Sequence, residues 1–240
     1  MPRIKYKNPP LSRVECEIRI SQNSPWDTTI PGLFYERLKE KYPLREKGNE
    51  ISTEFEPGPE GIQQKVKIID TLILKNIDNT IEIEITQDSL SVTHTVPYSS
   101  WENFIQVVDE ALAAYLTIND NIALERVHLR YINEISLPAT NNIELPDYFN
   151  IYPHSDYQAS YNAFMVGLQI PYNNDQDVLK LQLANREKLI IFSMDYFSNI
   201  SQQFSLTSLL TWLEEAHIAI NTKFEESITQ RLRERFEVID

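Results

Sequence analysis

Apolar and polar residues alternate along several segments of the chain, and this pattern predicts strands. In residues 13–20 every second side chain is apolar, and a period of two recurs in residues 66–76, 80–86, 90–96 and 126–136. Successive side chains of a strand point to opposite faces of its sheet, so each segment predicts one buried and one polar face. Short polar turns separate the segments between residues 66 and 96, which indicates a β-meander.

Apolar residues spaced by three and four predict three helices. A short one begins near Pro31, and a second begins at a Ser99-x-x-Glu102 capping box and extends to about residue 117. Residues 205–236 are predicted to form one long amphipathic helix, in whose apolar stripe His217 fills a gap. Such a helix either crosses the whole domain or covers a partner chain. The candidate interaction residues on it are Leu213, Ile220, Phe224, Ile228 and Leu232.

The second half of the chain repeats the plan of the first. Strands are expected at residues 161–170, 178–184 and 189–196, and they lead into the long helix as the first meander leads into its own. The sequence therefore predicts an α+β fold of two similar β-meander-plus-helix halves, with antiparallel sheets and a long C-terminal helix. Two unrelated motifs of similar appearance are the alternative.

The boundaries of these halves follow from composition. Residues 1–137 form the N-terminal half, residues 138–158 are a Pro- and Asn-rich connection, and residues 159–240 form the C-terminal half. Whether the halves share one core is left open. The polar stretch before residue 60, which contains Pro57-Gly58-Pro59, is interpreted as a loop.

The charge of the chain disfavours nucleic-acid and membrane partners. Against 22 basic side chains stand 35 acidic ones, for a formal net charge of −13, which repels phosphate backbones and anionic lipid surfaces. No apolar run is long enough for a signal peptide or a membrane span, and the single cysteine, Cys16, excludes an intrachain disulfide. A cytoplasmic location is expected, with a protein partner or a homo-oligomer.

Motifs for catalysis are missing from the sequence. The five glycines form no phosphate-binding loop, and the four histidines lie too far apart for a helical zinc motif. Glu82 and Glu84 have the spacing of nuclease carboxylates without the lysine, so a solvated sheet face is the simpler interpretation. We expect no cofactor, no metal and no catalytic residue, and we interpret Cys16 as an inert core thiol.

Two groups of side chains remain as candidates for ligand binding. Arg126, His128 and Arg130 share one face of the strand at residues 126–136, where they are suited to hold an anionic ligand. The alternative is an internal set of ion pairs with Glu15, Glu17 or helix glutamates. His217 is the second candidate, as a general base or switch, although a histidine on an apolar stripe is more often a core residue.

Three segments resemble a known family: Asn8-Pro-Pro-Leu with the strand VECEIRI, the strand LRYINEI, and the C-terminal LEEAHIAINTKFEESIT. The family is a sporadically distributed group of bacterial proteins of about 250 residues with no assigned function. Its recurrent motifs are L-R-Y-I-N-x-I and A-H-x-x-I-x-x-x-F-x-x-x-I-T, which correspond here to Leu129, Arg130, Tyr131, Ile132, Asn133 and Ile135, and to His217, Ile220, Phe224, Ile228 and Thr229. His128 stands where the family has glycine.

Together these observations favour a non-catalytic binding or regulatory protein that assembles with itself or with a protein partner. The resemblance adds an association with mobile or defence genes, because such families are patchily distributed. The alternative function is a small-ligand sensor or enzyme that uses the face formed by Arg126, His128 and Arg130.

Overall fold

The computed structural model has an α+β fold, which confirms the predicted class and the antiparallel pairing of its strands. It describes residues 4–21, 23–58, 61–96, 100–119, 122–138, 144–153, 163–186, 189–200 and 204–239, with only the backbone described in residues 49–58 and 61–69.

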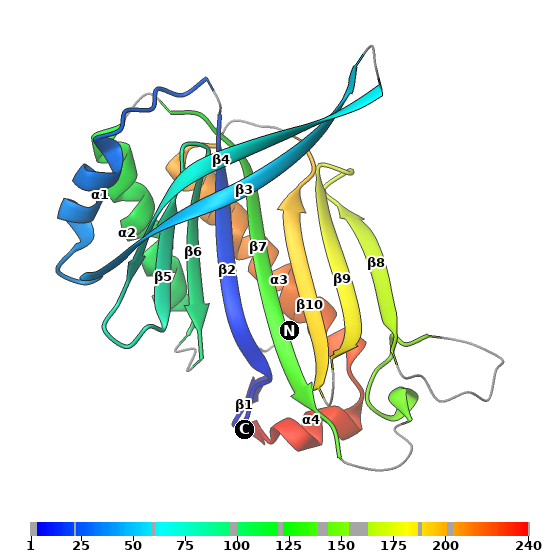
Figure 1. Ribbon diagram of the computed structural model, residues 1–240. Helices are drawn as coiled ribbons and strands as arrows, with labels where there is room; N and C mark the ends of the chain where they lie inside the picture. Colours follow the sequence, from blue (N-terminus) through cyan, green and yellow to red (C-terminus); the bar gives the residue numbers. More distant parts are fainter. Residues whose placement is uncertain are drawn as a thin grey trace.

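Nine strands form one antiparallel sheet in the order β3-β4-β5-β6-β2-β7-β10-β9-β8 (Figure 1). Their bounds are β2 Leu11–Ile20, β3 Leu44–Gly58, β4 Gly61–Lys75, β5 Ile81–Ile85, β6 Ser89–Thr95, β7 Leu124–Ser136, β8 Met165–Tyr172, β9 Asp177–Arg186 and β10 Leu189–Ser198. Strands β2 and β7 pair at the centre, and β7 also pairs with β10, so strands of both predicted halves share one sheet. All the alternating segments predicted in the first half lie on these strands.

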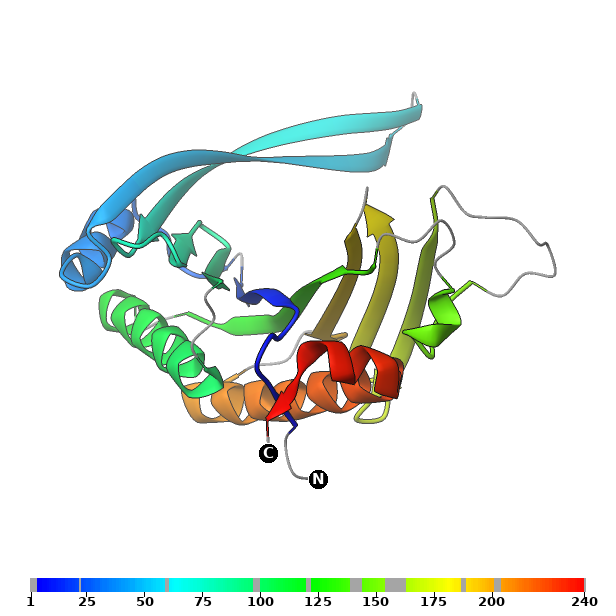
Figure 2. The ribbon, with the colours of Figure 1, turned by 90° about the horizontal axis from the view of Figure 1, so that it is seen from below.

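Helices α2 (Trp101–Ile118) and α3 (Leu206–Ser227) cover one face of the sheet, and α1 (Ile30–Leu38) packs beside α2 (Figure 2). The core lies between them and the apolar side chains of the strands, such as Ile18, Leu129 and Phe192. We call this the helix face and the opposite side the open face. In the described part of the chain, no helix is long and apolar enough to cross a membrane.

The stretch that was interpreted as a polar loop is instead strand β3, which pairs with β4 along its full length. Only Leu72–Lys75 of β4 pairs with β5, so the rest of the hairpin leaves the sheet and extends across its open face (Figure 2). The loop interpretation was wrong because β3 has few apolar residues and shows no alternation. Backbone hydrogen bonds to β4 define this strand.

The single helix predicted over residues 205–236 is two helices, α3 and α4 (Gln230–Phe236). Ser205 caps α3 as predicted, since its side chain accepts a hydrogen bond from the Ser208 backbone. The helix ends at Ile228, whose backbone is extended and forms a β-bridge with Phe149. Thr229 then caps α4 by accepting a hydrogen bond from the Leu232 backbone. The apolar spacing continues through this break, so periodicity alone did not reveal it.

The proposed interaction residues of this region lie in the core of the chain itself. Leu213, Ile220, Ile228 and Leu232 have no exposed surface, so they are not available to a partner. Phe224 is half-buried and stacks on Phe192 of β10. The apolar stripe therefore serves to hold α3 and α4 against the sheet.

A second small sheet joins the two ends of the described chain. Strand β1 (Lys5–Tyr6) pairs antiparallel with β11 (Val238–Ile239). The Tyr6 hydroxyl donates a hydrogen bond of 2.7 Å to Glu225, which also accepts one of 3.0 Å from Arg233. These contacts tie the first strand to α3 and α4.

Replacement of Leu213 by alanine tests the core position of the helix stripe. We expect Leu213→Ala to lower the free energy of unfolding by about 2–5 kcal/mol, because it leaves a cavity between α3 and the sheet. The control is Ile218→Ala on the exposed side of α3, where we expect a change within about 0.5 kcal/mol. Urea denaturation measures both. Equal stability of the two variants would contradict the assignment.

Candidate functional site

Charged side chains occupy the open face at the centre of the sheet. On β7, His128, Arg130 and Glu134 alternate with buried residues, as the sequence pattern predicts. The strand register places Lys180, Asp195, Arg130 and Glu15 side by side on β9, β10, β7 and β2. We call these four residues the charge row. Positive and negative groups alternate along it, so each charge has an opposite neighbour across the strands.

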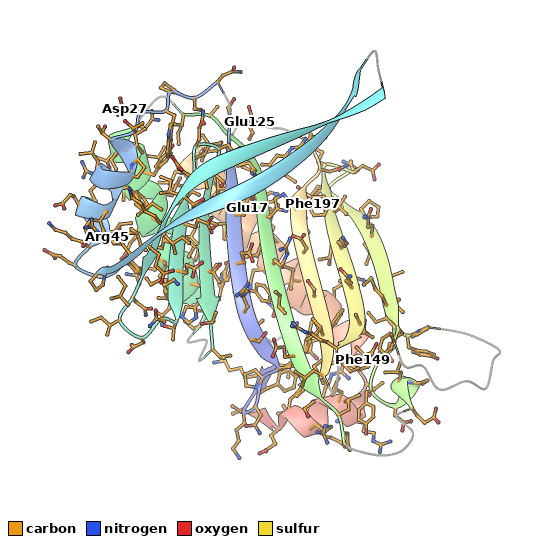
Figure 3. The ribbon with its side chains drawn as sticks, in the orientation of Figure 1. Glu17, Asp27, Arg45, Glu125, Phe149 and Phe197 are labelled. Carbon is orange, nitrogen blue, oxygen red and sulfur yellow. The ribbon has the colours of Figure 1, made fainter. Side chains whose placement is uncertain are left out.

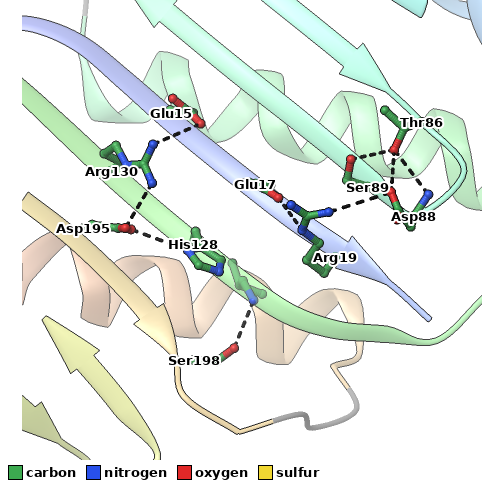
Figure 4. Close-up of polar contacts among 11 residues, drawn as sticks. Glu15, Glu17, Arg19, Thr86, Asp88, Ser89, His128, Arg130, Asp195 and Ser198 are labelled. Carbon is green, nitrogen blue, oxygen red and sulfur yellow. Dashed lines mark hydrogen bonds and ion pairs between the residues drawn. The ribbon is translucent and has the colours of Figure 1, made fainter. Parts of the chain in front are cut away.

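Arg130 is at the centre of this row and contacts both of its acidic members (Figure 4). Its Nη2 atom donates a hydrogen bond of 3.1 Å to Oδ2 of Asp195, and its Nη1 atom lies 3.9 Å from Oε1 of Glu15. The Arg130 side chain is 38% exposed and that of Asp195 only 14%. The better-buried Asp195 contact therefore contributes more than the looser, more solvated contact with Glu15.

His128 faces the same carboxylate without a hydrogen bond. Its Nδ1 atom lies 3.6 Å from Oδ1 of Asp195, and neither atom has a hydrogen-bond partner among the described residues. The imidazole ring stacks on Phe197 with ring centroids 5.3 Å apart. Figure 3 shows Phe197 on β10 and Glu17 on β2, the strands on either side of β7. His128 is thus held in place by stacking and lies beside a buried acceptor.

The surroundings of Asp195 lower the pKa of its carboxyl group. Burial opposes ionisation of the carboxyl group, but neighbouring His128 and the positive charge of Arg130 outweigh it. Asp195 is therefore ionised at neutral pH and serves as the buried anion of the charge row.

A shallow pocket of about 360 Å³ lies at one end of the charged face, beyond His128. Its lining residues are Arg19, Ile20, Asp88, Glu125, Arg126 and His128. Arg19 is already neutralised, since its Nε atom lies 2.5 Å from Glu17 and its Nη1 atom 3.8 Å from Asp88. Arg126 is exposed and forms no ion pair within the described residues. It is the cation best placed to contact a small anion here.

The structure brings together Arg126 and His128, which line one pocket, while Arg130 lies further along β7. Arg130 forms the internal ion pair with Glu15 that was the alternative to ligand binding. His217 does not join them, because it lies on the helix face. The sheet itself therefore separates His217 from the three candidate residues on β7.

His217 is buried in a polar cluster between α3 and the sheet. The Tyr131 hydroxyl forms a hydrogen bond with its Nδ1 atom, and Trp101 of α2 stacks on its ring with centroids 4.0 Å apart. Trp101 in turn donates a hydrogen bond of 2.5 Å to Glu214. These contacts join α2, α3 and β7, so the arrangement is that of a core histidine with its polar atoms engaged.

Sequence reasoning missed two carboxylates. Asp195 is the buried anion of the charge row, and the alternation with Met194 and Tyr196 indicates its place on the open face. Asp177 is the second carboxylate, and it is only 2% exposed. It accepts hydrogen bonds from Trp212, Tyr196 and Asn173. No local pattern predicts that contact, because Trp212 comes from α3.

The remaining chemical candidates have ordinary environments. Cys16 is buried on the helix face, and burial raises the pKa of its thiol. Glu82 lies on the open face, 3.5 Å from Lys75. Within the described ranges, no three histidine, cysteine or acidic side chains are grouped so that they could hold a metal ion.

Comparison with known proteins gives no assignment. A scan against protein-family models finds no match, and no curated protein matches the chain.

Truncation of Arg130 tests the role of the charge row in stability. We expect Arg130→Ala to lower the free energy of unfolding by about 1–2 kcal/mol, because it leaves the Asp195 carboxylate buried without its main partner. Arg13→Ala, an exposed arginine on the same face of β2, is the control and should change stability by less than about 0.5 kcal/mol. Chemical denaturation that gave both variants wild-type stability would contradict a structural role.

The lowered pKa of Asp195 predicts a pH dependence. A carboxyl group whose pKa falls on folding stabilises the protein above its unfolded pKa of about 4, and this contribution disappears as pH falls through the folded value. We therefore expect the melting temperatures of wild type and Asp195→Asn to converge between about pH 6 and pH 3. The exposed turn residue Asp78 provides the control, Asp78→Asn. A constant difference between wild type and Asp195→Asn would contradict the prediction.

Proposed function

We propose that this chain is a non-catalytic binding or regulatory protein and that the open face of the sheet binds its protein partner. The observation that carries this proposal is the uneven cover of the sheet. Helices cover one face, whereas the other presents ordered charged side chains and, among the described elements, is crossed only by the β3–β4 hairpin (Figure 2). Central strands with one polar, uncovered face form a broad and rigid surface.

The ion pairs of the charge row support a binding surface of fixed shape. Arg130 is held by Asp195 and Glu15, and Arg19 by Glu17 and Asp88, so little side-chain freedom is lost when a partner binds. Two exposed cations of the open face, Lys180 of the charge row and Arg126 of the pocket, have no ion-pair partner among the described residues and are free to contact a protein partner.

A protein suits this surface better than a nucleic acid does. Acidic and basic side chains alternate on the open face, and the chain as a whole carries a charge of −13. A phosphate backbone needs a continuous basic stripe, whereas protein interfaces combine polar rims with arginine-rich centres. The proposed partner is therefore a protein.

We further propose that the chain consists of two similar halves. Outward from the central β2–β7 pair, the sheet continues as β6, β5 and β4 on one side and as β10, β9 and β8 on the other. Each of these meanders leads into a helix, α2 or α3. This matched order supports a duplication, with α1 and β3 as additions to the first half.

The resemblance to the sporadic bacterial family is part of the same proposal. Its two motifs meet in this fold, because Tyr131 of the strand motif contacts His217 of the helix motif. The resemblance implies that the protein is cytoplasmic and that its gene belongs to a mobile or defence-associated set.

A small-ligand sensor is the second candidate function. The observation that favours it is the pocket beside His128, where Arg126 lacks an ion-pair partner among the described side chains. An anion there would contact Arg126 and His128, but not His217.

The proposal is tested on the double variant Arg126→Ala with Lys180→Ala. The partner is first identified by native mass spectrometry of protein purified from a bacterial host. We expect its binding to weaken at least about tenfold in the double variant, because arginine and lysine contacts at the interface are lost. Arg37→Ala with Lys5→Ala is the matched control: both residues are exposed and away from the open face, and the net charge changes equally.

Equal loss in both double variants would show a general charge effect and contradict the proposed surface. A spectrum that shows a bare monomer contradicts assembly altogether, and a retained small anion that disappears with Arg126→Ala favours the sensor instead.

A further inference from the structure

Strand β8 is an edge of the nine-stranded sheet and pairs only with β9 within the described chain. The opposite side of the sheet differs, because there the outer strand of the meander, β4, has β3 as a further neighbour. An edge strand presents unpaired backbone N–H and C=O groups that another strand can bind. The position next to β8 that corresponds to β3 is therefore vacant among the described strands.

Strand β8 lacks the charged side chains that usually protect an edge, and only Pro171 near its end opposes pairing. Its eight residues, MVGLQIPY, include no charged side chain. Strand β3, the other edge, carries Arg45, Glu46, Lys47, Glu50, Glu54 and Glu56. Charged side chains on an edge oppose pairing with another chain. The chain has a net charge of −13, but β8 itself carries no charge that would repel the same strand of a second copy.

Exposed apolar side chains lie on both faces of β8. Met165 is 68% exposed on the open face, and Leu168 is 43% exposed on the helix face. The register sets Val166, Leu168 and Ile170 beside the buried leucines of β9, so they extend the apolar layer of the core. Helix α3 packs on β7 and β10, which leaves this outer row partly uncovered.

We propose that β8 pairs antiparallel with β8 of a second copy of this chain, across a twofold axis. A twofold axis perpendicular to a sheet relates two edge strands in antiparallel orientation. With Leu168 opposite Leu168 of the second copy, Val166 faces Ile170, so the row on the helix face contains apolar pairs only. The pairing is limited to Val166 through Ile170, because Met165 falls opposite Pro171, which has no N–H to donate.

The resulting dimer is weak and depends on concentration. One short strand from each copy buries less area than the roughly 1,200–2,000 Å² of a stable complex. The dimer pairs through the outer edge of β8, whereas the charge row ends on β9 at Lys180, beside Gln169 of β8, so the pairing does not rest on the proposed partner surface.

Sedimentation equilibrium of the full chain tests the pairing. We expect wild type to pass from monomer to dimer between about 1 and 200 μM, a range typical of small interfaces. In Leu168→Lys two like charges face each other across the axis, so the dissociation constant should rise at least tenfold. The control is Ile77→Lys, a residue 75% exposed in the β4–β5 turn, which should dimerise as wild type does. Circular dichroism checks that both variants remain folded.

Disulfide trapping gives a second readout that does not depend on loss of a function. In Leu168→Cys the introduced thiols lie at the spacing of directly opposed strand residues, so oxidation should give a covalent dimer. Ile77→Cys should not give one, and Cys16 is buried and does not interfere.

Three results would overturn the proposal: a monomer over the whole concentration range, a Leu168→Lys variant that dimerises normally, or a β8 edge bound by a different protein while the chain alone stays monomeric. A dimer unaffected by Arg126→Ala with Lys180→Ala supports it and keeps the two surfaces distinct.

Discussion

The pairing of β2 with β7 is the interaction on which the rest of the structure depends. Each strand has an apolar face and a charged face, and their register places like faces together. A shift of one residue would turn the apolar side chains of one strand toward the open face and its charges into the core. The position of the helices and the order of the charge row both follow from this register.

The sequence predicted the segments whose residues alternate clearly, and it failed where structure depends on distant contacts. Arg126, His128 and Arg130 were placed on one face from their spacing alone, and the structure agrees. Strand β3 was missed because its backbone pairing with β4 leaves no apolar signature. The break before α4 was missed because the Ile228–Phe149 bridge links residues that are far apart in sequence.

The candidate site illustrates the same limit. A single strand shows which side chains share a face, but it does not show which partners neighbouring strands supply. Asp195 therefore appeared as a site residue only once β10 was paired with β7. Conversely, His217 looked like a candidate by residue type, yet its contacts with Tyr131 and Trp101 make it a link between helices and sheet. Tyr131 and His217 thus have structural roles that explain why both are buried.

The strand order also constrains when the chain can fold during its synthesis. Strand β2 is made early, but its neighbours β6 and β7 follow about 70 and 110 residues later. Contacts between residues this far apart close large loops and form slowly. Strand β1 waits longer still, because the residues of its partner β11 follow 232–234 positions later. The centre of the sheet therefore cannot form until β7 has left the ribosome, and until then one edge of β2 is without its partner strand.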